Sequence, residues 1–391
     1  MIRNTESNIA EIETNEKYGH LFPIVFSAND NYTPYAGVAI QSIIINANPR
    51  NEYRIYVLHT SISAKHIEEL EKMTTENVKV RCINVKHMIS SIQSPLPLSG
   101  YFTEEVYYRI LIPEIEELKG YPYAIYLDCD VIINTDIAGI VPRNMGNSLI
   151  AGVRDHAMVG KIERRMQDRE CLLDAAQYVN SGVMVINIPQ WIYEKTSKKC
   201  FDFLSDYSSK EYIFMDQDII NAVCKNRIFS LDESWNYNWF LRHGDSETVT
   251  RCRAITDRIG ENFHVLHYTT SLKPWCTLDH PYSEIFWRYA GRSPFLEEII
   301  KTNLCSKADL ENYSFFIHIG RAVTFIPHKL QGGIQCFREH GAGYAVRRTL
   351  FHMGLWEDEE VAKGPENRPK LLLSAQRRLH IKKEKQKNNH A

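Results

Sequence analysis

Residues 123–130 read YAIYLDCD, an apolar run that ends in two aspartates separated by one residue. A short apolar run of this kind is typical of a buried strand. In an extended chain, side chains two positions apart point the same way, so Asp128 and Asp130 would converge while Cys129 points into the protein. Two carboxylates at a strand end suit a hard divalent cation that shares the oxygens of a phosphate ligand. The pair by itself is more often a solvated acidic turn, but a buried strand that leads into two acids favours the metal site.

The segments on either side alternate between strand-like and helix-like patterns. The strand-like runs are residues 22–28, 54–58, 78–85, 183–188 and 263–267, and the helix-like runs are 34–46, 64–72 and 219–223. This alternation of strand-like and helix-like segments predicts an α/β fold with a mainly parallel sheet. Ligands of such sheets bind beyond the carboxyl ends of the strands, so we expect the site among the polar residues that follow these runs.

Three further polar clusters border predicted strands or helices. His267 ends one apolar run and would supply a neutral nitrogen ligand, and Lys273 lies six residues on, within reach of a phosphate. Asp216 precedes a helix-like run and is also explained as an N-cap. Gly182, after Asn180, is also explained by a tight turn. Each cluster taken singly has an ordinary structural explanation.

Composition and missing motifs narrow the class of protein. The 391 residues carry a formal net charge of −2 and nine scattered cysteines without a C-x-x-C pair, which predicts neither a zinc ribbon nor a disulfide framework. The sequence has no G-x-x-x-x-G-K-[ST] and no G-x-G-x-x-G motif, which argues against a P-loop kinase and a Rossmann dehydrogenase. Residues 1–20 do not resemble a signal peptide, and no apolar stretch is long enough to span a membrane. We therefore expect a cytoplasmic protein.

The pattern along the chain predicts four regions. They are a polar leader (1–20), a main domain (21–294), a smaller, mostly helical C-terminal extension (295–362) and a basic tail (363–391). The tail holds nine Lys and Arg residues against two Glu, a net charge of +7. It is either a solvated chain end or a contact for anionic lipid on the inner face of a membrane.

The order of the motifs resembles family 8 of the retaining glycosyltransferases, which includes bacterial lipopolysaccharide galactosyl- and glucosyltransferases and glycogenin. The matching stretches are IVFSANDNY (24–32), YYRI (107–110), YLDCD (126–130), YVNSGV (178–183), DQDIIN (216–221), HY (267–268) and KPW (273–275). The family often has Asp at the position of Asn29 and Gly at that of Thr270. The resemblance covers about residues 22–290.

The resemblance implies a GT-A fold with a Rossmann-like sheet. It also implies transfer of a hexose, glucose or galactose, from a UDP-sugar to a glycan or lipid-linked acceptor in cell-envelope polysaccharide or lipopolysaccharide-type synthesis, with no nucleic-acid partner. The implied uridine contacts are Ser27, Asn29, Asn31 and Tyr32, and the implied ligands of Mn²⁺ (or Mg²⁺) are Asp128, Asp130 and His267. Arg109 would contact the donor, Lys273 the diphosphate, and Asp155, Asn180 and Asp216 the donor sugar, with Gln217 at the reacting face.

Three questions of chemistry stay open at this point. Retention usually requires a carboxylate nucleophile, but the implied group is the Gln217 amide, which favours front-face attack by the acceptor over an intermediate linked to Gln217 or Asp216. The run LDCDV (127–131) also matches the haloacid dehalogenase signature, in which Asp128 would be the nucleophile of a phosphohydrolase. A non-catalytic UDP-sugar-binding protein is the third alternative.

Overall fold

The computed structural model describes residues 20–92, 104–156, 174–206, 215–276 and 280–303. All of them belong to one compact unit, Met1–Gly320. The basic tail, nearly all of the predicted leader and the part of the C-terminal extension after residue 303 lie outside the described residues. Among the described helices, none has the length and apolar character that crossing a bilayer requires.

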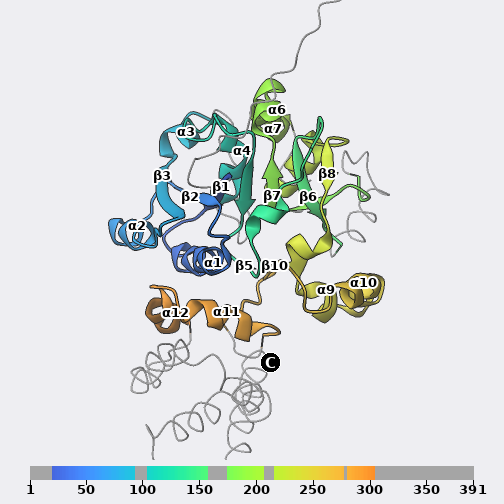
Figure 1. Ribbon diagram of the computed structural model, residues 1–391. Helices are drawn as coiled ribbons and strands as arrows, with labels where there is room; N and C mark the ends of the chain where they lie inside the picture. The colour runs from blue at the N-terminus through green and yellow to red at the C-terminus, as the bar shows by residue number, and fades with distance from the viewer. Residues whose placement is uncertain (1–19, 93–103, 157–173, 207–214, 277–279, 304–391) are drawn as a thin grey trace, which may run out of the picture. The chain divides into compact units, whose positions relative to one another are not determined.

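The central sheet has seven strands in the order β3-β2-β1-β4-β7-β6-β8 (Figure 1). They are β1 (Leu21–Ser27), β2 (Glu52–His59), β3 (Val78–Asn84), β4 (Ala124–Leu127), β6 (Ile150–Arg154), β7 (Val179–Ile186) and β8 (Ile228–Ser230). Four of the strand pairs are parallel, and β7 runs antiparallel to both β4 and β6. The predicted α/β class with a mainly parallel sheet is confirmed. The reversed β7 brings its own amino end beside the carboxyl end of β4.

Helices cover both faces of this sheet. Alternate strand residues point to opposite sides, and both sets are apolar, so each face needs a covering layer. In β1, Ile24 and Phe26 join a core with α1, α11 and α12, whereas Val25 joins a core with α4, α6, α7 and α8. The helices are α1 (Thr33–Asn46), α2 (Ala64–Glu71), α3 (Lys86–Ser90), α4 (Tyr108–Leu111), α6 (Ile188–Tyr193), α7 (Thr196–Asp206), α8 (Met215–Val223), α9 (Phe240–His243), α10 (Ser246–Ile259), α11 (Ser283–Ala290) and α12 (Leu296–Asn303). The 3-10 helices are η1 (Glu104–Tyr107), η2 (Ile112–Glu114), η3 (Ile137–Ile140) and η4 (Glu233–Asn236).

A second, three-stranded sheet lies beside the first. Its strands are β5 (Val131–Ile133), β10 (Val265–His267) and β9 (Tyr237–Asn238), with β10 in the middle. β10 runs antiparallel to β5 and parallel to β9, and His267 pairs with Val131. Because Val131 directly follows Asp130, this pairing brings His267 to the DCD motif.

Helix α12 begins inside the segment predicted as a C-terminal extension and packs on α1. Gly37 makes this packing possible, since a Cβ there would lie 2.2 Å from the ring of Phe295. Beside it, the buried imidazole of His66 lies 2.7 Å from Asp30 and 2.9 Å from Glu298 of α12. These contacts join α12 to α1, α2 and the loop after β1.

Candidate active site

Asp128, Cys129 and Asp130 connect β4 to β5 through a turn. The expectation of an extended chain here was wrong, because the backbone turns at Cys129 and Asp130 to enter the second sheet. Cys129 nevertheless points inward, and its Sγ donates to the backbone oxygen of Ser27 at 3.2 Å. The turn, rather than strand alternation, brings the two carboxylates together.

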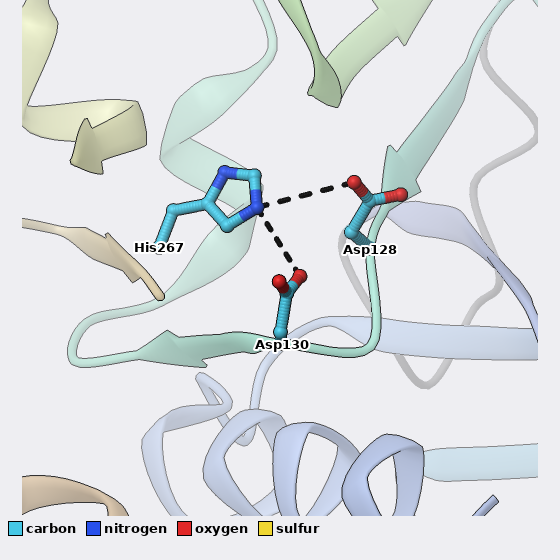
Figure 2. Close-up of side chains that lie close together, drawn as sticks. All are labelled: Asp128, Asp130 and His267. Atoms are coloured by element: carbon cyan, nitrogen blue, oxygen red, sulfur yellow. Dashed lines mark ion pairs between the residues drawn. The ribbon is translucent and has the colours of Figure 1, made fainter. Parts of the chain in front are cut away.

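Asp128, Asp130 and His267 form a group that could hold a metal ion. Their ligand atoms all lie within 4.8 Å of one another. Figure 2 shows the three side chains pointing to one centre, with His267 Nε2 3.2 Å from Asp130 Oδ1 and 3.9 Å from Asp128 Oδ2. Two carboxylate oxygens and one imidazole nitrogen are a donor set that suits Mn²⁺. The residues implied as metal ligands are therefore in place for such an ion.

Gly182 leaves the space that this group needs. A Cβ at Gly182 would lie 2.4 Å from both Asp128 Oδ2 and His267 Cε1. Its backbone oxygen also accepts the N–H of Asp128 at 2.7 Å. The turn explanation of Gly182 was wrong, because the residue lies within strand β7. A glycine is required there by the close approach of two ligand side chains.

Arg109 lies behind the metal group, buried on α4. Its Nη2 donates to Asp128 Oδ1 at 2.9 Å, and its Nη1 donates to the backbone oxygen of Ser181 at 2.7 Å. Its Nε lies 3.2 Å from Asp216 Oδ2, and its guanidinium lies over the ring of Tyr126. Arg109 thus links Asp128 to Asp216, an arrangement that the sequence did not predict.

Lys273 faces the opposite side of the group. Its Nζ donates to Asp130 Oδ2 at 2.5 Å and to the backbone oxygen of Tyr268 at 2.6 Å. Burial opposes ionisation of Asp130, but the ammonium of Lys273 holds the pKa of its carboxyl well below the ordinary range. Asp130 is therefore ionised at neutral pH, as a metal ligand must be.

A second cluster, made of Asp155, Asn180 and Gln217, lies next to the metal group. Gln217 Oε1 accepts the backbone N–H of Ser181 at 3.0 Å and the amide of Asn180 at 3.1 Å. Its Nε2 donates to Asp155 Oδ2 and to the Tyr178 hydroxyl, both at 3.1 Å. All the hydrogen-bonding positions of this amide are occupied, so the side chain is held in one orientation.

Asp216 is buried in the first turn of α8, with 3% of its surface exposed. The hydroxyl of Ser181 donates to its Oδ2 at 3.0 Å. Burial raises the pKa of Asp216 to about 6, against the opposing charge of Arg109 and with a smaller contribution from Asp128. The N-cap explanation was wrong, because Asp216 is the second residue of α8 and its side chain faces Arg109 and Ser181.

The four residues implied as uridine contacts lie at the carboxyl end of β1 and in the loop before α1. Ser27 is buried, Asn29 Oδ1 accepts the backbone N–H of Tyr32 at 3.1 Å, and Asn31 and Tyr32 are exposed. Burial, followed by the charge of Asp130, raises the pKa of the Tyr32 phenol. The hydrogen bond from Cys129 Sγ to the backbone oxygen of Ser27 joins the start of this loop to the turn that holds Asp128 and Asp130.

Asn236 is a residue of the candidate site that the sequence analysis did not single out. It is buried at the end of η4, where its Oδ1 lies 2.9 Å from His267 Nδ1 and its Nδ2 donates to Asn180 Oδ1 at 2.9 Å. The sequence offers little that would mark Asn236 as a site residue, because it stands in none of the matched stretches and precedes a strand of only two residues.

Several bacterial proteins are similar to this chain in sequence. General stress protein A of Bacillus subtilis is 25% identical over 270 residues, which cover 68% of this chain and 92% of that protein. A lipopolysaccharide 1,2-glucosyltransferase of Escherichia coli is 27% identical over 260 residues, which cover 65% of this chain and 73% of that enzyme.

Solved structures share the fold. The apo structure of the bifunctional glycosyltransferase WbbM superposes with a TM-score of 0.63 at 23% identity, covering 76% of this chain and 53% of WbbM. The galactosyltransferase LgtC, solved with donor and acceptor sugar analogues, gives 0.51 at 21% identity, covering 80% of this chain and 99% of LgtC. These likenesses confirm the expected GT-A fold. A sequence profile of glycosyl transferase family 8 matches residues 23–279, and the chain therefore belongs to that family.

Proposed function

We propose that this protein is a Mn²⁺-dependent, retaining hexosyltransferase that moves glucose or galactose from a UDP-sugar to a glycan or lipid-linked acceptor in cell-envelope polysaccharide or lipopolysaccharide-type synthesis. The observation that carries the proposal is the convergence of Asp128, Asp130 and His267 beside the cluster of Asp155, Asn180 and Gln217. The names of the relatives support a hexose donor, since one is a glucosyltransferase and another a galactosyltransferase.

The residues of the metal group would act on the leaving nucleotide. When bound, the divalent ion supplies Lewis-acid stabilisation, on the order of several kcal/mol, to the charge that develops on UDP. Asp128, Asp130 and His267 would hold it, and the ammonium of Lys273 would add fixed positive charge beside the diphosphate. The loop that holds Ser27, Asn29, Asn31 and Tyr32 would bind uridine.

The second cluster would act on the sugar. Asp155, Asn180 and Asp216 would bind its hydroxyls and orient the anomeric carbon. Arg109 pairs with both Asp128 and Asp216 and so holds the two carboxylates in fixed positions relative to each other. Both acceptor positions of Gln217 Oε1 are occupied by N–H donors, which makes this oxygen an even weaker nucleophile. We therefore favour front-face attack by the acceptor hydroxyl. A hexose adduct on Gln217 or Asp216, detected by mass spectrometry, would establish the linked intermediate instead.

The test is the release of UDP from a panel of UDP-sugars with Mn²⁺, with and without EDTA. We expect release with UDP-glucose or UDP-galactose that EDTA abolishes. Asp130→Ala should remove this activity without unfolding the protein, whereas Asp202→Ala, which changes an exposed carboxylate on α7, should keep it. Phosphatase activity without sugar-dependent UDP release would favour the phosphohydrolase, and donor binding without turnover would favour the binding protein.

A further inference from the structure

Asn236 contacts both halves of the site. Only 4% of its surface is exposed. One end of its amide lies 2.9 Å from His267 Nδ1 and the other lies 2.9 Å from Asn180 Oδ1. It therefore stands between a proposed metal ligand and a proposed sugar-binding residue.

The orientation of Asn180 follows from backbone groups. The N–H of Gly182 donates to Asn180 Oδ1 at 3.0 Å, and a backbone N–H can only donate, so the atom that faces it must be the oxygen. The other end of the Asn180 amide donates to Gln217 Oε1, which also accepts the backbone N–H of Ser181. Two backbone N–H groups thus establish which atom of each side-chain amide is oxygen.

The same reasoning extends to His267. Because Asn180 presents its oxygen, Asn236 must turn its NH₂ group toward Asn180 and its oxygen toward His267. The ring nitrogen that faces this oxygen, Nδ1, must then carry the proton. In the neutral imidazole this leaves the lone pair on Nε2, the atom 3.2 Å from Asp130 Oδ1.

We propose that Asn236 is a positioning residue that directs the Nε2 lone pair of His267 to the metal and couples this ligand, through Asn180, to the donor sugar. The proposal rests on the proposed metal function of His267. A hydrogen bond to the second nitrogen of a ligating histidine fixes its tautomer and ring orientation, and losing it typically costs about 10–100-fold in metal affinity.

Three variants separate the contact of Asn236 with His267 from its contact with Asn180. Asn236→Leu has a similar size and removes both hydrogen bonds. Asn236→Asp keeps an acceptor for the His267 Nδ1–H but turns a second acceptor toward Asn180 Oδ1. Asn51→Leu is the matched control, since Asn51 is also buried and lies just before the amino end of β2, away from the site.

Mn²⁺ affinity, measured by electron paramagnetic resonance without any sugar nucleotide, is the first readout. We expect about 10–100-fold weaker binding for Asn236→Leu and little change for Asn236→Asp and Asn51→Leu. Asn236→Asp should weaken binding of the UDP-hexose more than binding of UDP, because it disturbs Asn180. Unchanged Mn²⁺ affinity in Asn236→Leu would overturn the proposal.

The second readout is the histidine tautomer, from ¹⁵N NMR of the metal-free full-length protein at a pH where the ring is neutral, with His267 assigned through His267→Gln. We expect the proton on Nδ1 in the wild type and a shift toward Nε2 in Asn236→Leu. A wild-type proton on Nε2 would refute the inference. A wild type with the proton on Nδ1 that binds no Mn²⁺ would instead refute the proposed metal site.

Discussion

The two carboxylate oxygens of Asp128 have different neighbours. Oδ1 accepts hydrogen bonds from Arg109 and from the Tyr126 hydroxyl, both at 2.9 Å, whereas Oδ2 is the oxygen nearer to His267. Two donors on one oxygen restrict rotation of the carboxylate, so Asp128 would bind a metal through Oδ2 alone. This asymmetry arises from a buried arginine and from a tyrosine on β4.

Gly182→Ala tests how tightly this arrangement is packed. The new methyl group would overlap Asp128 Oδ2 and His267 Cε1, so we expect at least about a tenfold loss of Mn²⁺ affinity and roughly 1–3 kcal/mol of lost stability. Gly152→Ala on β6 is the control, because its methyl group would meet the side chain of Val179 instead. Equal Mn²⁺ affinity in the two variants would contradict this account.

The raised pKa of Asp216 leads us to predict that the stability of the fold depends on pH. Its folded pKa of about 6 lies above the ordinary 3.8, so the folded protein binds this proton more tightly than the unfolded chain does. Asp216 therefore favours folding below pH 3.8 relative to higher pH, and this contribution is lost as the pH rises to about 6. The shift corresponds to at most about 3 kcal/mol.

The measurement compares Asp216→Asn with the wild type by thermal unfolding in EDTA. The asparagine does not titrate, so we expect the Tm of the variant, relative to that of the wild type, to be higher at pH 8 than at pH 5. A difference in Tm that stays constant between these two pH values would show that Asp216 titrates normally.

At the scale of the elements, the sequence predicts the parts of the fold that have a repeating pattern. Long apolar runs such as residues 22–28 and 54–58 became β1 and β2 within two residues at each end. β5 and β9 have three and two residues, too few to show any periodicity. The direction of β7 was equally hidden, because alternation is the same for parallel and antiparallel strands. The site therefore depends on strand pairings that no local pattern contains.

The loop after β10 leads to a prediction about Thr270. Its φ of 75° is costly for a β-branched residue, by about 1–3 kcal/mol, whereas glycine adopts it freely. Thr270→Gly should thus leave stability unchanged or raise it, despite the greater flexibility of the unfolded chain. Thr269→Gly should lower the Tm, because Thr269 donates a 2.6 Å hydrogen bond to Asn238. Two equal losses of Tm would show that Thr270 is not strained.

At the scale of the whole molecule, the site draws on segments that are far apart in the chain. Ser27 ends β1, Asp128 directly follows β4 and His267 ends β10, so their approach depends on both sheets. The sequence supplied the candidates because each follows an apolar run or stands in a matched stretch. It did not supply Asn236 or the contacts of Arg109, since these depend on side chains that meet only after folding.

The basic tail, residues 363–391, has a net charge of +7, and we therefore predict that it contacts an anionic surface. The full-length protein should sediment with vesicles that contain anionic lipid, and a chain ending at residue 362 should sediment less. Neutral vesicles and high salt are the controls, because the attraction is electrostatic and screened by ions. Equal sedimentation of the two chains would rule out this role for the tail.

The second sheet also has a consequence for biosynthesis. Asp128 and Asp130 leave the ribosome well before His267, by on the order of 10–30 s at usual rates of chain elongation. Strand β10 has to insert between β5 and β9 before His267 reaches the two aspartates. A nascent chain that ends before β10 therefore contains all seven strands of the central sheet but still lacks one member of the group formed by Asp128, Asp130 and His267.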